Sequence, residues 1–182
     1  MGRLIEANPN LELEIVATDR LVDIVDEGFD AGIRLGESLR DGMTAVKIKP
    51  RLRFAVVGSP AYFDKHPVPT QPADLQDHVC IRNIYPSGVA YPWEFNRYDK
   101  TIEFEPTGPI LLDDHELMVG AALSGVALAD VWEDRARPYI ENGRLVECLA
   151  SWRAPEDWLY LYYLTRKHLS AGLRAIIEAL RT

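Results

Sequence analysis

An arginine at the end of a short apolar segment is the first residue of this sequence that suggests binding chemistry. Residues 28–37 read GFDAGIRLGE, so Arg34 closes a predicted strand and is soon followed by Gly36 and Glu37. A guanidinium group can hold a carboxylate through two parallel hydrogen bonds, and a nearby glycine lets the backbone approach a ligand. The alternative is a structural ion pair of Arg34 with Asp19 or Glu37, and both interpretations stay open.

Further polar side chains fall where predicted strands end or predicted helices begin. Thr18 follows an alternating apolar segment, and Asp113 and Asp114 precede a predicted helix. Tyr85 and Ser87 could present two hydroxyl groups from one loop. In an open α/β sheet, ligands bind at the carboxyl ends of strands, near the N-termini of helices. These residues are therefore candidates for ligand contact, although helix capping also explains the two aspartates.

Motifs of catalysis and metal binding are missing from the sequence. It contains no G-x-S-x-G nucleophile motif, no glycine-rich phosphate loop and no H-E-x-x-H pair. His66, His78 and Cys80 fall in one region, but their spacing matches no standard zinc site, and ordinary surface or core histidines are the favoured interpretation. We therefore expect no enzyme activity, no bound metal and no cofactor.

Composition and charge narrow the class of protein. A chain of 182 residues with 47% hydrophobic and 26% charged residues can bury one sizeable core or two small ones. Its net charge of -8 argues against a surface for nucleic acid, which needs an excess of lysine and arginine. Only two cysteines, Cys80 and Cys148, and no apolar N-terminal segment favour the reducing cytoplasm. Both cysteines are interpreted as buried apolar side chains rather than as a redox switch.

The N-terminal part of the sequence predicts a strand, a helix and a second strand. Residues 11–16 alternate as a strand does, residues 20–27 place apolar side chains on one helical face, and residues 29–34 are again strand-like. A right-handed crossover of this kind would make Ile15 and Ile33 parallel neighbours in one sheet.

Strand and helix patterns alternate through the rest of the chain. Extended segments at residues 46–57, around Pro50, and at residues 158–164 are long enough to pass between two α/β lobes. Shorter predicted strands lie at residues 79–81, 93–95, 102–104, 109–112, 126–129 and 144–146. Predicted helices or helical turns follow Ser59, lie at residues 71–75 and 133–140, end at Leu123, and follow Ser170.

Several segments of the sequence, taken in combination, resemble one known family. They are GFDAGIRLGE, VVGSPAYFDKHPVPTQPADLQDHVCI, WEFN, DDHELMVGAALSGVALA and NGRLVECLASW, and their order and spacing are family-like. Together they resemble the effector-binding domain of LysR-type transcriptional regulators over essentially the whole chain. A departure is ALADVWEDR, where relatives commonly have a proline-containing turn after the apolar strand.

This resemblance implies an α/β fold of the type II periplasmic-binding-protein kind, with two subdomains joined by a two-strand hinge and separated by a ligand cleft. Subdomain I is expected at residues 1–50 and 156–182, and subdomain II at residues 51–155. The winged helix-turn-helix, linker helix and first strand of the family would precede residue 1, so the chain is interpreted as an N-terminally truncated fragment.

The resemblance also implies a function and a set of contacts. The expected role is a ligand-sensing and oligomerisation domain, homodimeric or homotetrameric, of a cytoplasmic regulator that binds DNA through its absent N-terminal domain. The expected effector is a small organic acid. A periplasmic-type solute-binding protein for a transporter shares the fold and is the alternative. Ligand contacts of family members map onto Thr18, Arg34, Gly36, Glu37, Tyr85, Ser87, Asp113 and Asp114.

Overall fold

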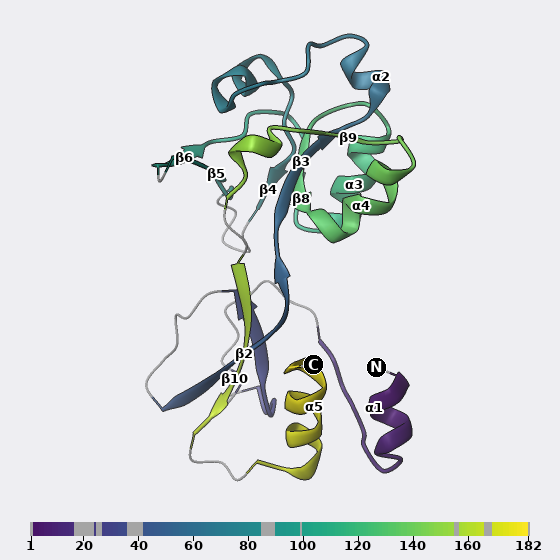
Figure 1. Cartoon of the computed structure of the whole chain (residues 1–182), viewed down its shortest axis with the longest axis vertical. Helices are drawn as coiled ribbons and strands as arrows, with labels where there is room; N and C mark the ends of the chain where they lie inside the picture. The colour runs from purple at the N-terminus through teal and green to yellow at the C-terminus, as the bar shows by residue number, and fades with distance from the viewer. Residues whose placement is uncertain are drawn as a thin grey trace. The chain divides into compact units, whose positions relative to one another are not determined.

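The chain forms two units in its computed structural model. Unit 1 consists of Met1–Leu52 and Asp157–Thr182, and unit 2 consists of Arg53–Glu156. The chain therefore passes from one unit to the other twice, after Leu52 and before Asp157 (Figure 1). The structure describes residues 2–16, 24, 27–35, 42–84, 90–98, 100–154, 157–165 and 169–181.

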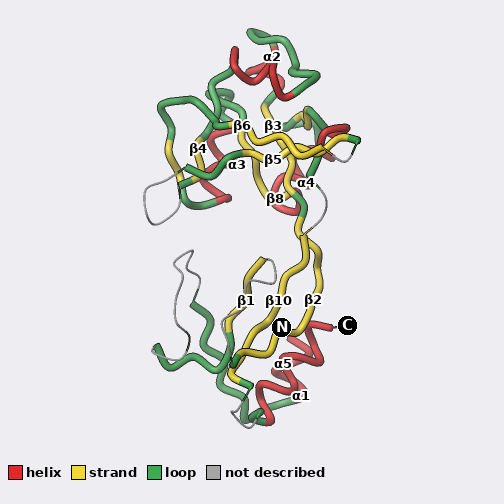
Figure 2. The backbone as a smooth tube through the Cα atoms, turned by 90° about the vertical axis from the view of Figure 1, so that its left-hand side faces the viewer, coloured by secondary structure: helices red, strands yellow, loops and turns green. Residues whose placement is uncertain are grey.

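The sheet of unit 1 has its C-terminal strand in the centre. β1 (Gly32–Leu35) and β2 (Met43–Leu52) both pair antiparallel with β10 (Asp157–Leu164), which gives the order β1-β10-β2 (Figure 2). The pairing of β2 with β10 skips residues 49 and 50 at a bulge. Pro50 fits at this bulge because a proline has no backbone N–H to donate to a neighbouring strand.

The helices α1 (Gly2–Ala7) and α5 (Ala171–Arg181) also belong to unit 1. Ser170 caps α5 as predicted, since its hydroxyl accepts a hydrogen bond from the backbone N–H of Leu173 at 3.1 Å. Leu173 and Ile177 lie one turn apart and are buried against one face of the sheet. The buried strand residues in the same cluster are Val46, Ile48 and Leu161.

Unit 2 contains a second antiparallel sheet, in which β3 (Phe54–Gly58) lies between β8 (Ala129–Trp132) and β9 (Val146–Cys148). The helix α3 (His115–Leu123) follows β7 (Leu111–Leu112) along the chain, and α4 (Glu133–Glu141) follows β8. Both helices contribute to the core on one face of this sheet. These bounds confirm the two predicted helices.

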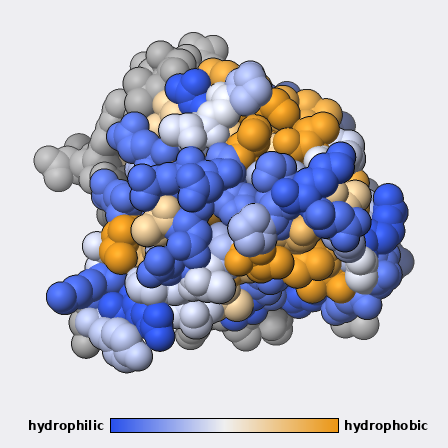
Figure 3. All heavy atoms as spheres, turned by 90° about the horizontal axis from the view of Figure 1, so that it is seen from above, coloured by the Kyte–Doolittle hydropathy of each residue, from blue (hydrophilic) through white to orange (hydrophobic). Residues whose placement is uncertain are grey.

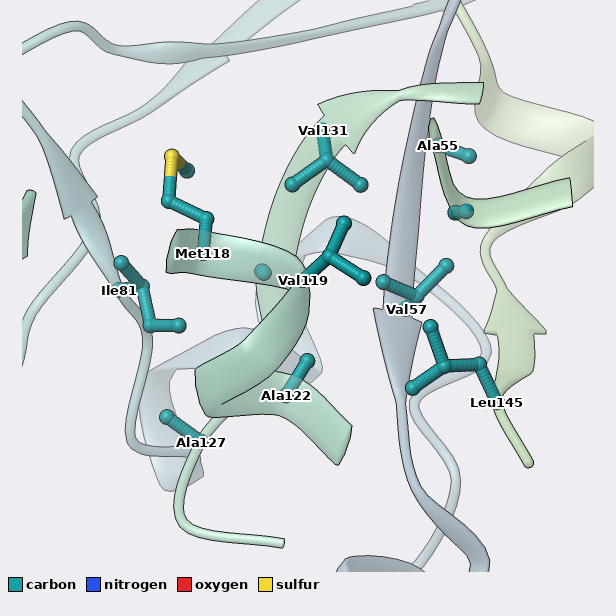
Figure 4. Packing of buried hydrophobic residues seen from close by; sticks show 11 residues of the cluster. Ala55, Val57, Ile81, Met118, Val119, Ala122, Ala127, Val131 and Leu145 are labelled. Atoms are coloured by element: carbon teal, nitrogen blue, oxygen red, sulfur yellow. The ribbon is translucent and has the colours of Figure 1, made fainter. Parts of the chain in front are cut away.

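The core of unit 2 is built from small and branched apolar side chains. Figure 4 shows Val119 and Ala122 of α3 close to Val57 of β3 and Val131 of β8, with Met118 beside them. All five side chains are at most 2% exposed. Removing such side chains from water contributes most of the favourable free energy of folding, at about 25 cal/mol per Å² of apolar surface.

The opposite face of the same sheet packs against a second cluster, which contains Val56, Cys148, Trp93 and Phe95. The aromatic residues Trp93 and Phe95 come from a hairpin in which Trp93 pairs with Phe104. The remaining elements of unit 2 are β4 (Arg82–Asn83), β5 (Trp93–Arg97), β6 (Lys100–Phe104), β7 (Leu111–Leu112), α2 (Pro60–Phe63) and the 3₁₀ helices η1 (Pro72–Asp77) and η2 (Ala150–Trp152).

A buried tyrosine joins the segment that begins at α2 to the segment that follows η1. The hydroxyl of Tyr62 accepts a hydrogen bond from the backbone N–H of Val79 and lies 3.1 Å from Nδ1 of His78. The His78 side chain is only 5% exposed, and the ring of His66 stacks on Tyr62 with centroids 4.5 Å apart. His78 is therefore a hydrogen-bonded core residue. The described part of the chain contains no group of histidine, cysteine and acidic residues arranged to hold a metal ion.

Three sequence-based predictions of strands are wrong. Residues 11–16 are not in a strand, so Ile33 is not a parallel neighbour of Ile15 and instead pairs antiparallel with Leu161. Alternation alone does not make a strand, because a strand needs a partner for its backbone hydrogen bonds. The strands expected at 126–129 and 144–146 are displaced toward the C-terminus, to β8 and β9, by the pairing register of β3.

Other expectations are only partly met or lie outside the described residues. The predicted strand 79–81 is reduced to a single parallel bridge between Cys80 and Leu128, and regular pairing of β4 begins at Arg82. Most of the predicted helix at 20–27 falls outside the described residues.

The face of the protein seen in Figure 3 is mostly polar. Figure 3 shows hydrophilic side chains over much of the face seen from above, with separate apolar patches among them. Exposed apolar residues of unit 2 include Val68, Leu117 and Val126. Within the described ranges, no helix has both the length and the apolar character that crossing a bilayer requires.

Candidate ligand-binding site

The described residues include three of the eight predicted ligand contacts. Arg34 lies in β1 of unit 1, whereas Asp113 and Asp114 precede α3 in unit 2. The other five predictions lie outside the described residues, and these are Thr18, Gly36, Glu37, Tyr85 and Ser87.

The sheet of unit 1 places Arg34 on the face that does not pack against α5. Arg34 pairs with Tyr160 of β10, which pairs on its other side with Lys47 of β2. Side chains alternate between the two faces of a strand, so this row lies opposite the apolar row that contains Leu161. We call the face that carries Arg34 and Tyr160 the aromatic face of unit 1. Its residues are Arg34, Lys47, Trp158, Tyr160 and Tyr162.

The guanidinium group of Arg34 is held over an aromatic ring. Its Cζ atom lies 4.9 Å from the centroid of the Tyr162 ring. Tyr162 in turn lies over Gly32, its partner in the antiparallel pair. A Cβ atom built on Gly32 would come within 2.7 Å of Tyr162 Cε1, and closer still to the hydroxyl end of the ring. Gly32 therefore leaves room for the tyrosine ring, and the ring supports the arginine two residues further along β1.

Lys47 makes a separate contact of the same kind. Its Nζ atom lies 4.2 Å from the centroid of the Trp158 ring and 5.8 Å from that of Tyr160. Trp158 and Tyr162 are four positions apart on one strand, which corresponds to about 13 Å. The two cations thus lie over different rings, and a single small carboxylate would contact one of them. Arg34 is the better candidate, since its planar fork matches a carboxylate.

The two aspartates at the start of α3 differ in their roles. Asp114 is the N-cap of the helix, and its carboxylate accepts a hydrogen bond from the backbone N–H of Leu117 at 2.9 Å. Glu116, in the first turn, forms an ion pair with Arg135 at 2.8 Å. Asp113 is exposed. Asp113, Asp114 and Glu116 bring negative charge to this helix start, and their carboxylates favour hydrogen-bond donors or cations over a ligand carboxylate.

Asp130 is an acidic residue that the sequence did not single out. It lies in a row with Val56 and Cys148 across the sheet of unit 2, on the face that packs against Trp93. The pKa of Asp130 is raised to about 7, mainly by burial, with the nearby negative charge of Glu94 acting in the same direction. The residue as a whole is half-buried, and its carboxyl group lies in a largely apolar environment that disfavours the charged form.

Cys80 and Cys148 are both buried in the second cluster of unit 2. Burial raises the pKa of each thiol to about 12, which leaves the reactive thiolate almost unpopulated at neutral pH. The interpretation of both residues as small apolar side chains agrees with this environment.

One pattern in the sequence could have identified the aromatic residues of β10 as candidates, although none of them was predicted as a ligand contact. Aromatic side chains recur at Trp158, Tyr160 and Tyr162 with a period of two, which places all three on one face of a strand. Their position beside Arg34 depends on the pairing register of two segments far apart in the chain, which the alternation does not specify.

Comparison with known proteins gives a consistent result over the whole chain. A family model described as the LysR substrate binding domain matches residues 1–182. A putative transcriptional regulator of Pseudomonas aeruginosa is 38% identical over 174 residues, which cover 95% of this chain and 57% of that protein. The HTH-type transcriptional regulator PgrR of Escherichia coli is 31% identical over 182 residues, covering all of this chain and 61% of its own length. The chain thus spans less than two thirds of these relatives.

Solved structures show the same fold at low sequence identity. The full-length Vibrio cholerae virulence activator AphB, a member of the LTTR family, is similar with a TM-score of 0.82 and 22% identity over 98% of this chain and 60% of that one. The regulatory domain of CrgA, a LysR-type transcriptional regulator from Neisseria meningitidis, gives 0.83 and 21% over 98% of this chain and 87% of that domain. The predicted α/β fold of the type II periplasmic-binding-protein kind is confirmed.

Proposed function

Because this chain belongs to the LysR substrate-binding domain family, a family of regulators and not of enzymes, we propose that it senses a small organic acid for a bacterial LysR-type transcriptional regulator. The observation that carries the proposal is the guanidinium of Arg34, oriented on the ring of Tyr162 at the edge strand of unit 1. The curated relatives are transcriptional regulators, which favours this role over the solute-binding protein of a transporter.

The two units are proposed to act as the two subdomains of the sensor, with boundaries near residues 50 and 156. In this proposal the effector binds in the inter-subdomain cleft that the family resemblance implies and takes contacts from both subdomains. The contacts of subdomain I are Thr18, Arg34, Gly36 and Glu37, and those of subdomain II are Tyr85, Ser87, Asp113 and Asp114.

The chemistry of the described contacts narrows the class of effector. Arg34 is suited to a carboxylate, which it can hold with two charge-assisted hydrogen bonds. Asp113 and Asp114 can only accept hydrogen bonds when they are ionised, so they suit a hydroxyl or ammonium group of the same ligand. We therefore propose a hydroxy acid or an amino acid in preference to a simple dicarboxylate.

Regulation requires that the effector bind one arrangement of the subdomains more tightly than another, since a ligand shifts an equilibrium only by its difference in affinity. In the proposed regulator, this shift changes how paired chains hold their DNA-binding domains. Assembly as a homodimer or homotetramer, DNA binding by the remainder of a longer protein, and location in the cytoplasm are parts of the same proposal.

Thermal denaturation of the purified chain tests the proposal. Hydroxy acids, amino acids, dicarboxylates, aromatic acids and sugars are screened, and an acid present at a hundred times its Kd should stabilise the native state by about 2.7 kcal/mol. For a chain of this length that corresponds to a rise in Tm of about 5–10 °C. Arg34→Gln should weaken binding of that acid about 10- to 100-fold, because a charged hydrogen-bond pair is lost.

The matched control is Arg144→Gln. Arg144 is also stacked on a tyrosine, with its Cζ atom 5.3 Å from the centroid of the Tyr139 ring, but it lies in unit 2 and is exposed. This variant should keep the full response to the acid. An equal response in Arg34→Gln and the unmodified chain, or no response to any acid, would contradict the proposal.

A further inference from the structure

The hydroxyl group of Tyr62 lies where two segments of unit 2 meet. Tyr62 belongs to α2, and its hydroxyl oxygen lies 3.1 Å from the backbone nitrogen of Val79 and 3.1 Å from Nδ1 of His78. His78 and Val79 follow η1 directly. Tyr62 is 2% exposed and His78 is 5% exposed. Polar atoms buried to this extent need hydrogen-bond partners within the protein, so these contacts determine which proton states the group tolerates.

The contacts of the Tyr62 hydroxyl assign the position of each proton. The backbone N–H of Val79 can only donate, so the Tyr62 oxygen is the acceptor in that hydrogen bond. The hydroxyl has one proton of its own, and among the described residues Nδ1 of His78 is the acceptor within its reach. A proton on Nδ1 would leave the buried O–H without an acceptor. Nδ1 is therefore unprotonated, and the neutral ring of His78 carries its proton on Nε2.

Protonation of His78 is incompatible with this arrangement. A charged imidazolium ring has an N–H group at both nitrogens, so Nδ1 changes from an acceptor to a donor. The Tyr62 oxygen would then face two donors, the ring of His78 and the backbone N–H of Val79. Either the O–H of Tyr62 is left without an acceptor in the core, or the two side chains separate. The hydrogen bonds are all satisfied only while His78 is neutral.

The groups around His78 favour its neutral form. Burial is the main reason that its pKa lies below the ordinary value of 6.5, and a positive charge on His66 acts in the same direction. The carboxylates of Asp77 and Asp74 act in the opposite direction and do not reverse the shift. The ring of His66 stacks on Tyr62 with centroids 4.5 Å apart, and its centroid lies 6.0 Å from that of His78.

Two thiols complete the surroundings of this pair. Cys80 and Cys148 belong to the same buried cluster as Tyr62, and Sγ of Cys80 lies 3.8 Å from the carbonyl oxygen of His78. Burial raises the pKa of each thiol to about 12, and it also raises the pKa of Tyr62 above its ordinary value. Tyr62 and both thiols therefore keep their protons across the pH range in which histidines titrate.

We propose that the hydrogen bond between Tyr62 and His78 is an acid-sensitive attachment of α2 to the segment that follows η1, closed while His78 is neutral and opened when its ring is protonated. The folded state takes up this proton less readily than the unfolded chain, so the free energy of unfolding falls as the pH decreases below about 6.5. The inference concerns unit 2 alone. It does not depend on an effector, and it holds even if Arg34 binds no acid.

Nuclear magnetic resonance of the whole chain, labelled with nitrogen-15, tests the attachment. The chain has four histidines, and the ring signals of His78 are identified by their loss in His78→Asn. At about pH 7.5 the nitrogen shifts should show an unprotonated Nδ1 and a protonated Nε2. As acid charges this ring, the protection of the Val79 N–H against hydrogen exchange, corrected for the intrinsic effect of pH, should fall about 5- to 30-fold. The N–H of Ile81, which donates to the carbonyl oxygen of Leu128 at 2.8 Å, is the internal reference and should keep its protection.

Two variants separate this hydrogen bond from a general loss of stability. His78→Asn replaces Nδ1 by an amide oxygen, an acceptor that does not titrate, so Val79 should stay protected at both pH values. Tyr62→Phe keeps the ring and removes the hydroxyl, so the protection of Val79 should be low at both. Any of three results would overturn the proposal: a proton on Nδ1 in the neutral ring, a ring of His78 that stays neutral until the whole chain unfolds, or equal protection of Val79 before and after His78 becomes charged.

Discussion

Replacing Gly32 by alanine should disturb the aromatic face of unit 1, because the ring of Tyr162 lies over this glycine. A Cβ atom at this position would come within 2.7 Å of Tyr162 Cε1 and closer still to the hydroxyl end of the ring, whereas ordinary contacts between such carbons begin near 3.4 Å. The ring has little freedom to move away, because Tyr162 is 7% exposed on the central strand of the sheet. The substitution therefore forces either a rotation of Tyr162 or a shift of β1.

The expected cost follows from two opposing effects. Overpacking a buried site typically costs about 1–3 kcal/mol. Alanine also lowers the conformational entropy of the unfolded chain, which stabilises the folded state by about 0.4–1 kcal/mol. We expect a net destabilisation of about 1–2 kcal/mol, which for a chain of this size is a fall in Tm of about 2–8 °C. Arg34 loses the ring beneath it, so acid binding should weaken as well.

Urea and thermal denaturation followed by circular dichroism measure this effect. Gly120→Ala is the matched control, since Gly120 lies within α3 with nothing within 4 Å of an added Cβ. It should stabilise the protein by about 0.5–1 kcal/mol, the helix propensity difference between the two residues. The reasoning is refuted if Gly32→Ala is as stable as the unmodified chain, or if it costs as much when Tyr162 has first been replaced by alanine.

Two further predictions concern buried titratable groups of unit 2. The pKa of Asp130 is raised to about 7 in the folded state. The folded protein therefore keeps this proton at pH values at which the unfolded chain has released it. As a result, the free energy of unfolding falls as the pH rises from about 4 to 7. Asp130→Asn should therefore be more stable than the unmodified chain at pH 8, by up to about 4 kcal/mol for a shift of about three pKa units, with little difference at pH 4, as measured by urea denaturation. The thiols of Cys80 and Cys148, with pKa values of about 12, should resist iodoacetamide at pH 8 in the native protein and react fully in urea. Modification of either native thiol, detected by mass spectrometry, would contradict the buried environment.

Elements defined by contacts within a few residues could be predicted from the sequence. Ser59 before Pro60, Asp114 before His115 and Ser170 before Ala171 each mark the start of a helix that the structure contains. A cap binds a backbone N–H only three positions away, so its residue type and the apolar spacing that follows are enough to place it.

Strand pairing was the part of the fold that local patterns predicted least well. The alternation at residues 11–16 looks like that of β1, yet only β1 has a strand partner in the described structure. A strand is stabilised by hydrogen bonds and side-chain packing from a segment that can lie anywhere in the chain. The pattern of a segment therefore shows which face it would bury, and does not show whether a partner is present.

The same division applies to the candidate site. The sequence by itself pointed to Arg34, because an arginine at a strand end followed by glycine is a local feature. Only the tertiary structure placed Tyr162 between Gly32 and Arg34, and brought the hydroxyl of Tyr62 to His78 and Val79. The physical reason is that both arrangements depend on which distant backbones are hydrogen-bonded neighbours, a choice made by the free energy of the whole fold and not by any single segment.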